Sequence, residues 1–130
     1  MTVRTALTTE STIQKSCVAW MRYRHPEILM WATPNSGKMK PQHGVERKAL
    51  GVLAGVADLA VIVGSGTKSL PPKMVFVEMK TLKGRLSPAQ KVFQAQCWEL
   101  GAPYYVCRSL DEFIETIEGE IKGDSDAQAG

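Results

Sequence analysis

Two apolar, β-branched runs near the middle of the 130-residue chain constrain its fold most strongly, because each also carries a carboxylate. The first, 58–63, opens with Asp58 and is otherwise apolar; the second, 74–80, contains Glu78 near its end. Runs of this kind, bounded by glycine or proline, predict buried strands. The segment between them is rich in glycine, serine and proline. We therefore predict two neighbouring antiparallel strands joined by a long hairpin loop.

Helical and extended patterns alternate along the rest of the chain. Ser11 and Gln14 have the spacing of a capping box, which predicts a helix start. Ser87, Pro88 and Gln90 predict a second start, with serine as the N-cap and proline at the first helical position. The order of elements predicts an α/β domain with a mixed four-stranded sheet flanked by helices. Besides the two strands above, the predicted elements are helices at 11–25, 45–53, 88–100 and from 110 onward, strands at 28–32 and 104–107, and a turn and loop at 33–43.

Composition excludes several classes of protein. With 44% hydrophobic and 22% charged residues, the chain has ordinary globular composition, which argues against wholesale disorder or a collagen-like repeat. Its three cysteines and two histidines show no CxxC pair and no metal-ligand spacing, so the sequence predicts neither a disulfide framework nor a zinc site. No segment has the length of a signal peptide's apolar core or of a membrane span, which predicts a soluble cytoplasmic protein without a membrane partner.

The net charge of +3 is the sum of two unlike parts. Residues 1–108 carry 15 basic against 6 acidic residues, a net +9, whereas residues 109–130 carry 1 against 7, a net −6. A strongly basic body favours an anionic partner, with nucleic acid first and a membrane surface second. We predict an N-terminal arm at 1–9, one domain at 10–118 and a flexible acidic tail at 119–130 that cleavage activity does not need.

The ionisable residues on the two central strands predict a reactive site. Period-two alternation places Glu78 and Lys80 on the same face of their strand, beside the strand that Asp58 opens. Two adjacent carboxylates repel each other unless a cation lies between them, and hard oxygen ligands favour Mg²⁺ or Mn²⁺ over zinc. Lys80 would then hold or activate a water molecule directed at phosphorus. The alternative is a purely structural trio in which Glu78 and Lys80 form a salt bridge.

Three motifs in this order resemble one nuclease family. They are Gly55-Val-Ala-Asp58-Leu, Phe76-Val-Glu78-Met-Lys80 and Gly84-Arg-Leu-Ser87-Pro-Ala-Gln90. Together they resemble the VRR-NUC domain, a branch of the PD-(D/E)xK nuclease superfamily, over roughly residues 10–117. The segment from Trp31 to Lys38 resembles the P-N-G-G segment that follows the family's first strand, with Ser36 in place of a glycine. Ala57 replaces a common proline. The fold that this resemblance implies has a restriction-endonuclease-like core.

The resemblance also implies roles for particular residues. Asp58, Glu78 and the backbone carbonyl of Met79 would bind Mg²⁺ or Mn²⁺, and Lys80 would position the attacking water. Glu10 matches the family's helical acid and would bind the metal directly or through water. Gln90 matches a glutamine of the family's site, although its spacing from Ser87 is equally that of a capping box. The expected DNA contacts are Asn35, Lys38, Lys40, Arg47, Lys48, Lys83 and Arg85.

The resemblance implies a metal-dependent endonuclease that hydrolyses DNA phosphodiester bonds and uses no small-molecule cofactor. Stand-alone members are similar to Holliday junction resolvases, so we expect selectivity for branched DNA and a homodimer whose two sites match a junction's symmetry. We expect the protein to act in the cytoplasm of a bacterial host cell, and a phage is a candidate source of its gene. Two alternatives stay open: a non-catalytic DNA-binding module on a nuclease fold, and a restriction-like duplex endonuclease, which the lack of a recognition region disfavours.

Overall fold

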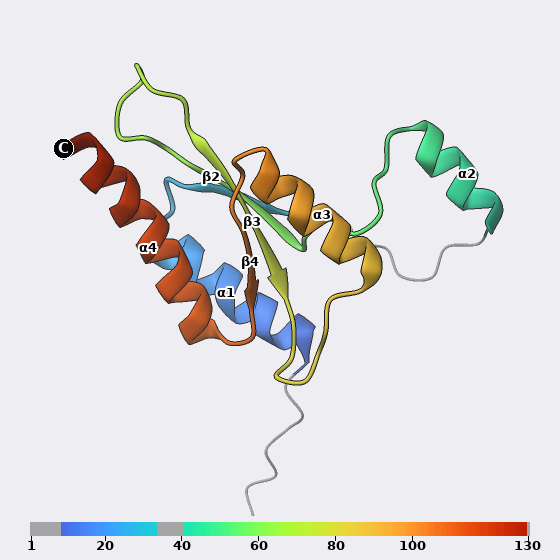
Figure 1. The fold of residues 1–130 in the computed structure, drawn as a ribbon. Helices are drawn as coiled ribbons and strands as arrows, with labels where there is room; N and C mark the ends of the chain where they lie inside the picture. Colours follow the sequence, from blue (N-terminus) through green and yellow to red (C-terminus); the bar gives the residue numbers. More distant parts are fainter. Residues whose placement is uncertain (1–8, 34–40, 130) are drawn as a thin grey trace, which may run out of the picture.

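A mixed four-stranded sheet organises the chain, as the sequence predicts (Figure 1). The structure, a computed structural model, describes residues 9–33 and 41–129. The strands lie in the order β1-β2-β3-β4 within one sheet. The elements are α1 (Glu10–Arg24), β1 (Leu29–Ala32), α2 (Pro41–Ala49), β2 (Leu59–Val63), β3 (Lys73–Met79), α3 (Pro88–Glu99), β4 (Tyr104–Cys107) and α4 (Leu110–Ala129).

Strand register places the two carboxylate-bearing runs side by side. β2 pairs with β3 in antiparallel fashion, with Leu59 opposite Val77, so the predicted hairpin is confirmed. β1 adds to β2, also antiparallel, and β4 adds to β3 in parallel, with Met79 opposite Cys107. The parallel pair requires the crossover through α3, because a short turn cannot return the chain in the same direction. The α/β fold class is therefore confirmed.

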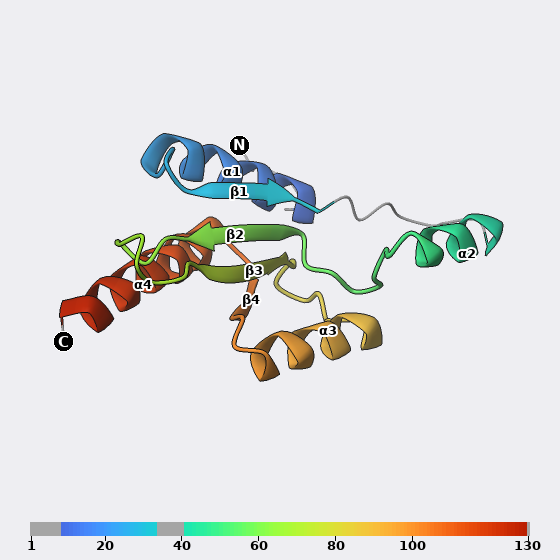
Figure 2. The same cartoon turned by 90° about the horizontal axis from the view of Figure 1, so that it is seen from above.

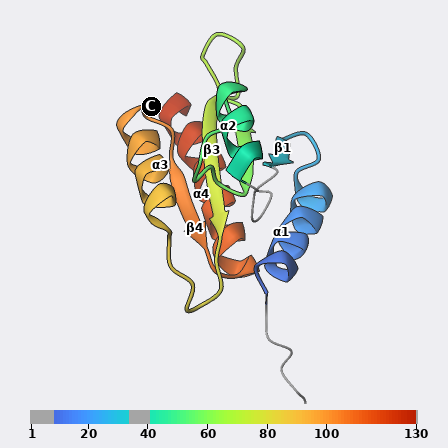
Figure 3. The same ribbon diagram turned by 90° about the vertical axis from the view of Figure 1, so that its right-hand side faces the viewer.

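The helices cover the two faces of the sheet unequally. α1 and α4 pack on one face and α3 on the other, which Figure 3 shows from the side. Ile13, Cys17 and Met21 of α1 join Phe113 and Ile117 of α4 over buried strand residues. The smaller cluster under α3 unites its Phe93 and Cys97 with Tyr104, Ala57 and partly buried neighbours. α2 stands apart from this body in Figure 1 and Figure 2.

One of the two predicted capping boxes is wrong. α1 begins at Glu10, and the hydroxyl of Thr9 accepts a hydrogen bond from the backbone N–H of Thr12 at 3.1 Å. Thr9 is therefore the N-cap, and Ser11, predicted as the cap, lies inside the first turn. Threonine and serine are nearly equivalent as caps, so the sequence alone did not separate them. The box at the start of α3 is confirmed, with both of its hydrogen bonds formed.

The second helix is shifted relative to the predicted one. α2 spans 41–49 rather than 45–53, so part of the loop predicted at 38–43 is helical. Proline is well tolerated at the first helical position, where its missing N–H costs no hydrogen bond. The helix ends because Gly51 adopts a φ of 94°, and its N–H and that of Val52 bond back to carbonyls of the last turn. The turn predicted at 34–37 lies outside the described residues.

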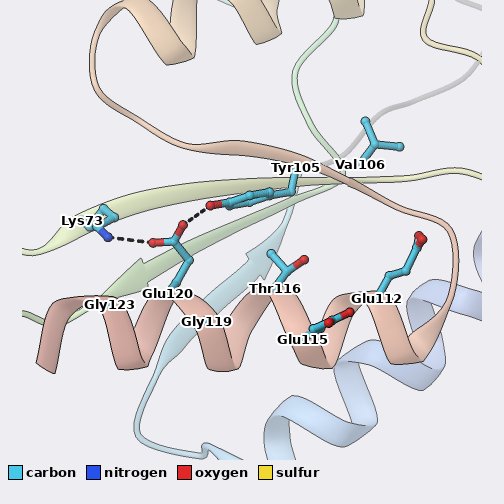
Figure 4. A pocket seen from close by; sticks show the side chains of 9 residues that line it. All are labelled: Lys73, Tyr105, Val106, Glu112, Glu115, Thr116, Gly119, Glu120 and Gly123. Carbon is cyan, nitrogen blue, oxygen red and sulfur yellow. Dashed lines mark hydrogen bonds and ion pairs between the residues drawn. The ribbon is translucent and has the colours of Figure 1, made fainter. Parts of the chain in front are cut away.

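The acidic C-terminal segment differs from the flexible tail expected at 119–130. α4 continues through it, and the Glu120 side chain is only 8% exposed. Its carboxylate accepts a hydrogen bond from Lys73 Nζ at 2.7 Å and another from the hydroxyl of Tyr105 (Figure 4). Both partners belong to strands of the sheet. Because Glu120 is buried between two sheet residues, its part of α4 belongs to the domain. Nothing in the pattern of this acidic, glycine-containing segment predicts that Glu120 pairs with the sheet.

Removal of residues 119–130 is consequently expected to destabilise the protein. The loss of two hydrogen bonds to a charged group predicts a decrease of about 2 kcal/mol or more in the free energy of unfolding. Glu120→Ala alone should produce most of this loss in urea unfolding. Glu115→Ala is the matched control, because Glu115 lines the same hollow between β4 and α4 as Glu120 but is exposed. Equal stability of the Glu120 and Glu115 variants would contradict the assignment.

Candidate active site

Asp58 is held at the start of β2 by both neighbouring strands. Its Oδ2 accepts a hydrogen bond from the backbone N–H of Met79 at 2.7 Å. Its backbone carbonyl accepts one from the N–H of Thr33, just beyond β1, at 2.8 Å. The β2–β3 register, continued by one residue, sets Asp58 opposite Glu78. The carboxylate is thus fixed by the same hydrogen-bonding pattern that builds the sheet.

Glu78 is the most unusual ionisable group of the site. Its side chain is 1% exposed, and its Oε1 has no hydrogen-bond partner among the described residues. The pKa of Glu78 is raised to about 9, chiefly by burial and then by the hydrogen bond and the negative charge of Asp58, while Lys80 acts in the opposite direction. A buried carboxylate with a free oxygen needs either a proton or a cation to compensate it.

Lys80 completes the predicted trio. It follows β3 directly, and its side chain is 9% exposed. Its backbone N–H donates a hydrogen bond to the backbone carbonyl of Cys107 at 3.1 Å. Its charge lowers the pKa of Glu78, so the ammonium group lies within electrostatic range of that carboxylate. The structure therefore brings Asp58, Glu78 and Lys80 together, whereas an exposed sheet-edge salt bridge would leave them in water.

The donor set fits a hard divalent cation. Two carboxylates converge, and one of them has a buried oxygen that no described residue hydrogen-bonds. Among the residues that the structure describes, no three His, Cys, Asp or Glu side chains are arranged to hold a metal by themselves. The remaining ligands would have to be backbone carbonyl oxygens or water. Mg²⁺ suits such an arrangement, because it usually keeps several waters and takes one or two protein carboxylates.

Glu10 borders the same site from the first turn of α1. It lines a groove of about 480 Å³ together with Asp58 and Gln14. Its negative charge contributes to the raised pKa of Glu78, although less than burial and Asp58 do. Glu10 is exposed and is not part of a three-carboxylate cluster with the strand residues. This position suits contact with a metal through water better than direct ligation.

The first turn of α3 packs tightly on the loop that leads to Asp58. A Cβ added to Gly55 would lie 2.3 Å from the carbonyl oxygen of Ala89 and 2.8 Å from the N of Gln90. Gly55 also has a φ of 82°, which other residues rarely adopt. The side-chain oxygen of Gln90 accepts a hydrogen bond from the N–H of Ser87 at 2.8 Å. Gln90 is therefore beside the loop, with its oxygen engaged in the helix cap.

The predicted DNA contacts fall in three places. Lys83 and Arg85 are exposed in the loop after β3, near the carboxylates in the sequence. Arg47 and Lys48 lie on α2, which stands apart from the sheet in Figure 1. Asn35, Lys38 and Lys40 lie outside the described residues.

Sequence reasoning missed two residues next to the site. Tyr104 is 2% exposed, its hydroxyl has no partner among the described residues, and burial and the charges of Glu78 and Asp58 raise its pKa. Because Tyr104 is opposite Phe76, it shares the face of Glu78, a placement that needs the strand register. Arg108, directly after β4, donates from Nη1 to the carbonyls of Thr81 and Gly84, each at 2.6 Å.

Arg108 therefore holds the loop that follows Lys80. A guanidinium with two short hydrogen bonds to carbonyls of one loop fixes that loop's shape. Arg108→Ala is expected to lower the free energy of unfolding by roughly 1–3 kcal/mol and to increase proteolysis between Thr81 and Arg85. Lys122→Ala serves as a control on an exposed basic residue of α4. If protease cleaves this loop equally fast in Arg108→Ala and in wild type, Arg108 does not anchor the loop.

The comparisons with known proteins agree with this fold. The family model described as VRR-NUC domain matches residues 8–111. A solved structure named "VRR_NUC domain protein" superposes with a TM-score of 0.64 at 22% sequence identity, covering 88% of this chain and 89% of that one. Another, named "VRR_NUC domain", gives a TM-score of 0.55 at 21% identity and covers 85% and 97% of the two chains. At this identity the likeness to the solved structures concerns the fold. No curated protein matches the chain.

Proposed function

Because this chain belongs to the VRR-NUC domain family, a nuclease-type domain, we propose that it is a metal-dependent endonuclease that hydrolyses DNA phosphodiester bonds. The observation that carries the proposal is the convergence of Asp58 and Glu78 beside Lys80, with a buried oxygen of Glu78 left without a partner among the described residues. A non-catalytic DNA-binding module would have no use for a buried, uncompensated carboxylate, because such a group costs stability.

The position of each residue suggests its role in the proposed reaction. Asp58, Glu78 and the carbonyl of Met79 would hold Mg²⁺ or Mn²⁺, with Glu10 acting through water. When bound, the metal would stabilise negative charge on the phosphate oxygens and ease deprotonation of water. Lys80 orients the attacking water and offsets charge that develops at phosphorus. The largely buried position of Lys80 strengthens this effect, because electrostatic interactions weaken in bulk water.

Selectivity for branched DNA is the finer part of the proposal. The described residues form a single core around the carboxylates. Selectivity would therefore come from DNA shape and from two copies acting as a homodimer. A two-fold symmetric dimer presents two equivalent sites to a four-way junction. We propose that it acts in the bacterial cytoplasm, as a host or phage protein. Among the described residues, none of the helices has the length and apolar character needed to cross a bilayer.

A cleavage panel tests the proposed function. Purified protein is incubated with linear duplex, single strands, flaps, splayed arms and four-way junctions, each with Mg²⁺, Mn²⁺ or EDTA. The expected result is metal-dependent cleavage, strongest on the four-way junction. Absence of products on every substrate, from folded protein with metal present, would overturn the endonuclease. Equal rates on all substrates would overturn only the preference for branches, and a monomer mass at cleaving concentrations would overturn the dimer.

Metal binding can also be measured without cleavage. Mn²⁺ at about 100 times its dissociation constant is expected to stabilise the folded protein by ~2.7 kcal/mol, which raises the melting temperature. Glu78→Gln should abolish this rise, because it removes one ligand while keeping the shape of the side chain. Glu99→Gln, on the exposed end of α3, is the matched control and should keep it. A full rise in Glu78→Gln would exclude Glu78 as a ligand.

A further inference from the structure

The groove that contains Asp58 extends along α1, away from the carboxylates. Its lining continues from Glu10 through Lys15 to Arg22, with Val18 and Ala19 between the two basic residues. The acidic side chains thus lie at one end of the groove and the basic ones follow it along the helix. Val18 and Ala19 are small and uncharged, so the part of the groove between the two cations is neither blocked by a large side chain nor negatively charged.

Lys15 and Arg22 are available to a ligand. Both are exposed, and no described carboxylate forms an ion pair with either of them. Seven residues separate them, which is about 10 Å along a helix axis at 1.5 Å per residue. One strand of a duplex advances about 3.4 Å per phosphate along the duplex axis, so a helix parallel to that axis would span roughly three nucleotides over this distance. Two free cations at such a spacing match a polyanionic backbone better than a small ligand.

A second hollow, at the β4 edge of the sheet, is acidic. The hollow between β4 and α4 is lined by Glu112, Glu115 and Glu120, and the basic Lys73 is hydrogen-bonded to Glu120 (Figure 4). A DNA strand is repelled from such a surface. The groove along α1 therefore offers a phosphate backbone a favourable route away from the carboxylates.

We propose that the DNA strand carrying the scissile phosphate runs along α1, with Lys15 and Arg22 each binding one of its phosphates. This inference rests on the proposed endonuclease function and adds a substrate path to it. Phosphate contacts fix register and supply affinity, but they carry no base sequence. The path would thus hold a strand of any sequence across Asp58 and Glu78, as shape-based selection requires.

The test is a binding titration with the full chain in EDTA, where no cleavage occurs. A labelled four-way DNA junction is titrated at several salt concentrations with wild type and with a Lys15→Gln, Arg22→Gln double variant. Each lost phosphate contact should reduce the slope of log affinity against log salt by ~0.9, which weakens binding about five- to tenfold per contact at 0.1 M salt. A Lys15→Arg, Arg22→Lys double variant, which keeps both charges, should bind nearly as wild type does.

The control removes the same charge elsewhere. A Lys68→Gln, Lys122→Gln double variant changes two exposed lysines outside the groove. If it loses affinity and slope as strongly as the groove variant, the overall field of the protein explains binding and the proposed path is wrong. An unchanged slope in the groove variant also overturns it. Wild type that binds through the groove but never cleaves with metal would overturn the endonuclease and leave the path intact.

Discussion

Lys80→Ala is expected to reduce metal-dependent DNA cleavage by about 10²–10⁴-fold, the usual effect of removing a group that assists proton transfer or charge development in the transition state. Lys80 lies beside the carboxylates at the end of β3, where bulk water hardly reaches it. Single-turnover cleavage of a four-way junction at saturating protein measures the effect on the chemical step. DNA affinity measured in EDTA should change far less, because one phosphate contact at most is lost.

The controls separate chemistry from charge and folding. Lys68→Ala removes a lysine from the exposed loop between β2 and β3 and should cleave at the wild-type rate. Lys80→Arg keeps the charge but enlarges a largely buried group, so partial activity is expected. Cleavage by Lys80→Ala within threefold of wild type would remove Lys80 from the catalytic residues, and with it the mechanism proposed above.

Gly55→Ala is expected to cause the largest loss of stability from a single methyl group. The added Cβ would lie 2.3 Å from a backbone carbonyl oxygen of α3, which cannot rotate out of the way as a side chain can. Overpacking of this kind costs about 1–3 kcal/mol, and the positive φ of 82° adds roughly 1 kcal/mol. A total near 3 kcal/mol corresponds to a decrease of roughly 10 °C in melting temperature.

Gly51→Ala is a closely matched control for this substitution. Gly51 has a φ of 94°, similar to that of Gly55, but an added Cβ there meets no atom within 4 Å. It should lose only the conformational part, about 1 kcal/mol. Equal melting temperatures for the two variants would show that the close approach between the Asp58 loop and α3 does not exist in solution. Urea unfolding of both variants gives the free energies directly.

The sequence predicted those parts of the fold that short-range patterns determine. The two central strands, their antiparallel pairing and the start of α3 each depend on alternation, turn residues or caps within a few positions. The grouping of Asp58, Glu78 and Lys80 also came from this level, because strand parity and neighbouring strands suffice to bring them together. The raised pKa of Glu78 then follows from burial, which an interior strand imposes.

Contacts between residues far apart in the sequence could not be predicted from such short-range patterns. Glu120 is 47 residues from Lys73, and Arg108 is 24 residues from Gly84. Each looks like an ordinary surface charge in the sequence, and only the packing of α4 and the end of β4 gives it a partner. The route along α1 was missed for a related reason: Lys15 and Arg22 are typical solvent-facing helix residues until the groove beside them is known.

The antiparallel pairing of β2 with β3 also bears on how the site forms and what a bound cation does to it. Asp58 and Glu78 meet across a single hairpin, so their encounter requires closure of the loop at 64–72 and no crossover. A cation bound between them would link the two strands near their open end, opposite the connecting loop. Amide hydrogen exchange of residues 59–63 and 74–79 should therefore slow when the cation binds, while exchange in α4 changes little. The cation that supports the chemistry would thus also crosslink β2 and β3 and stabilise the centre of the sheet locally.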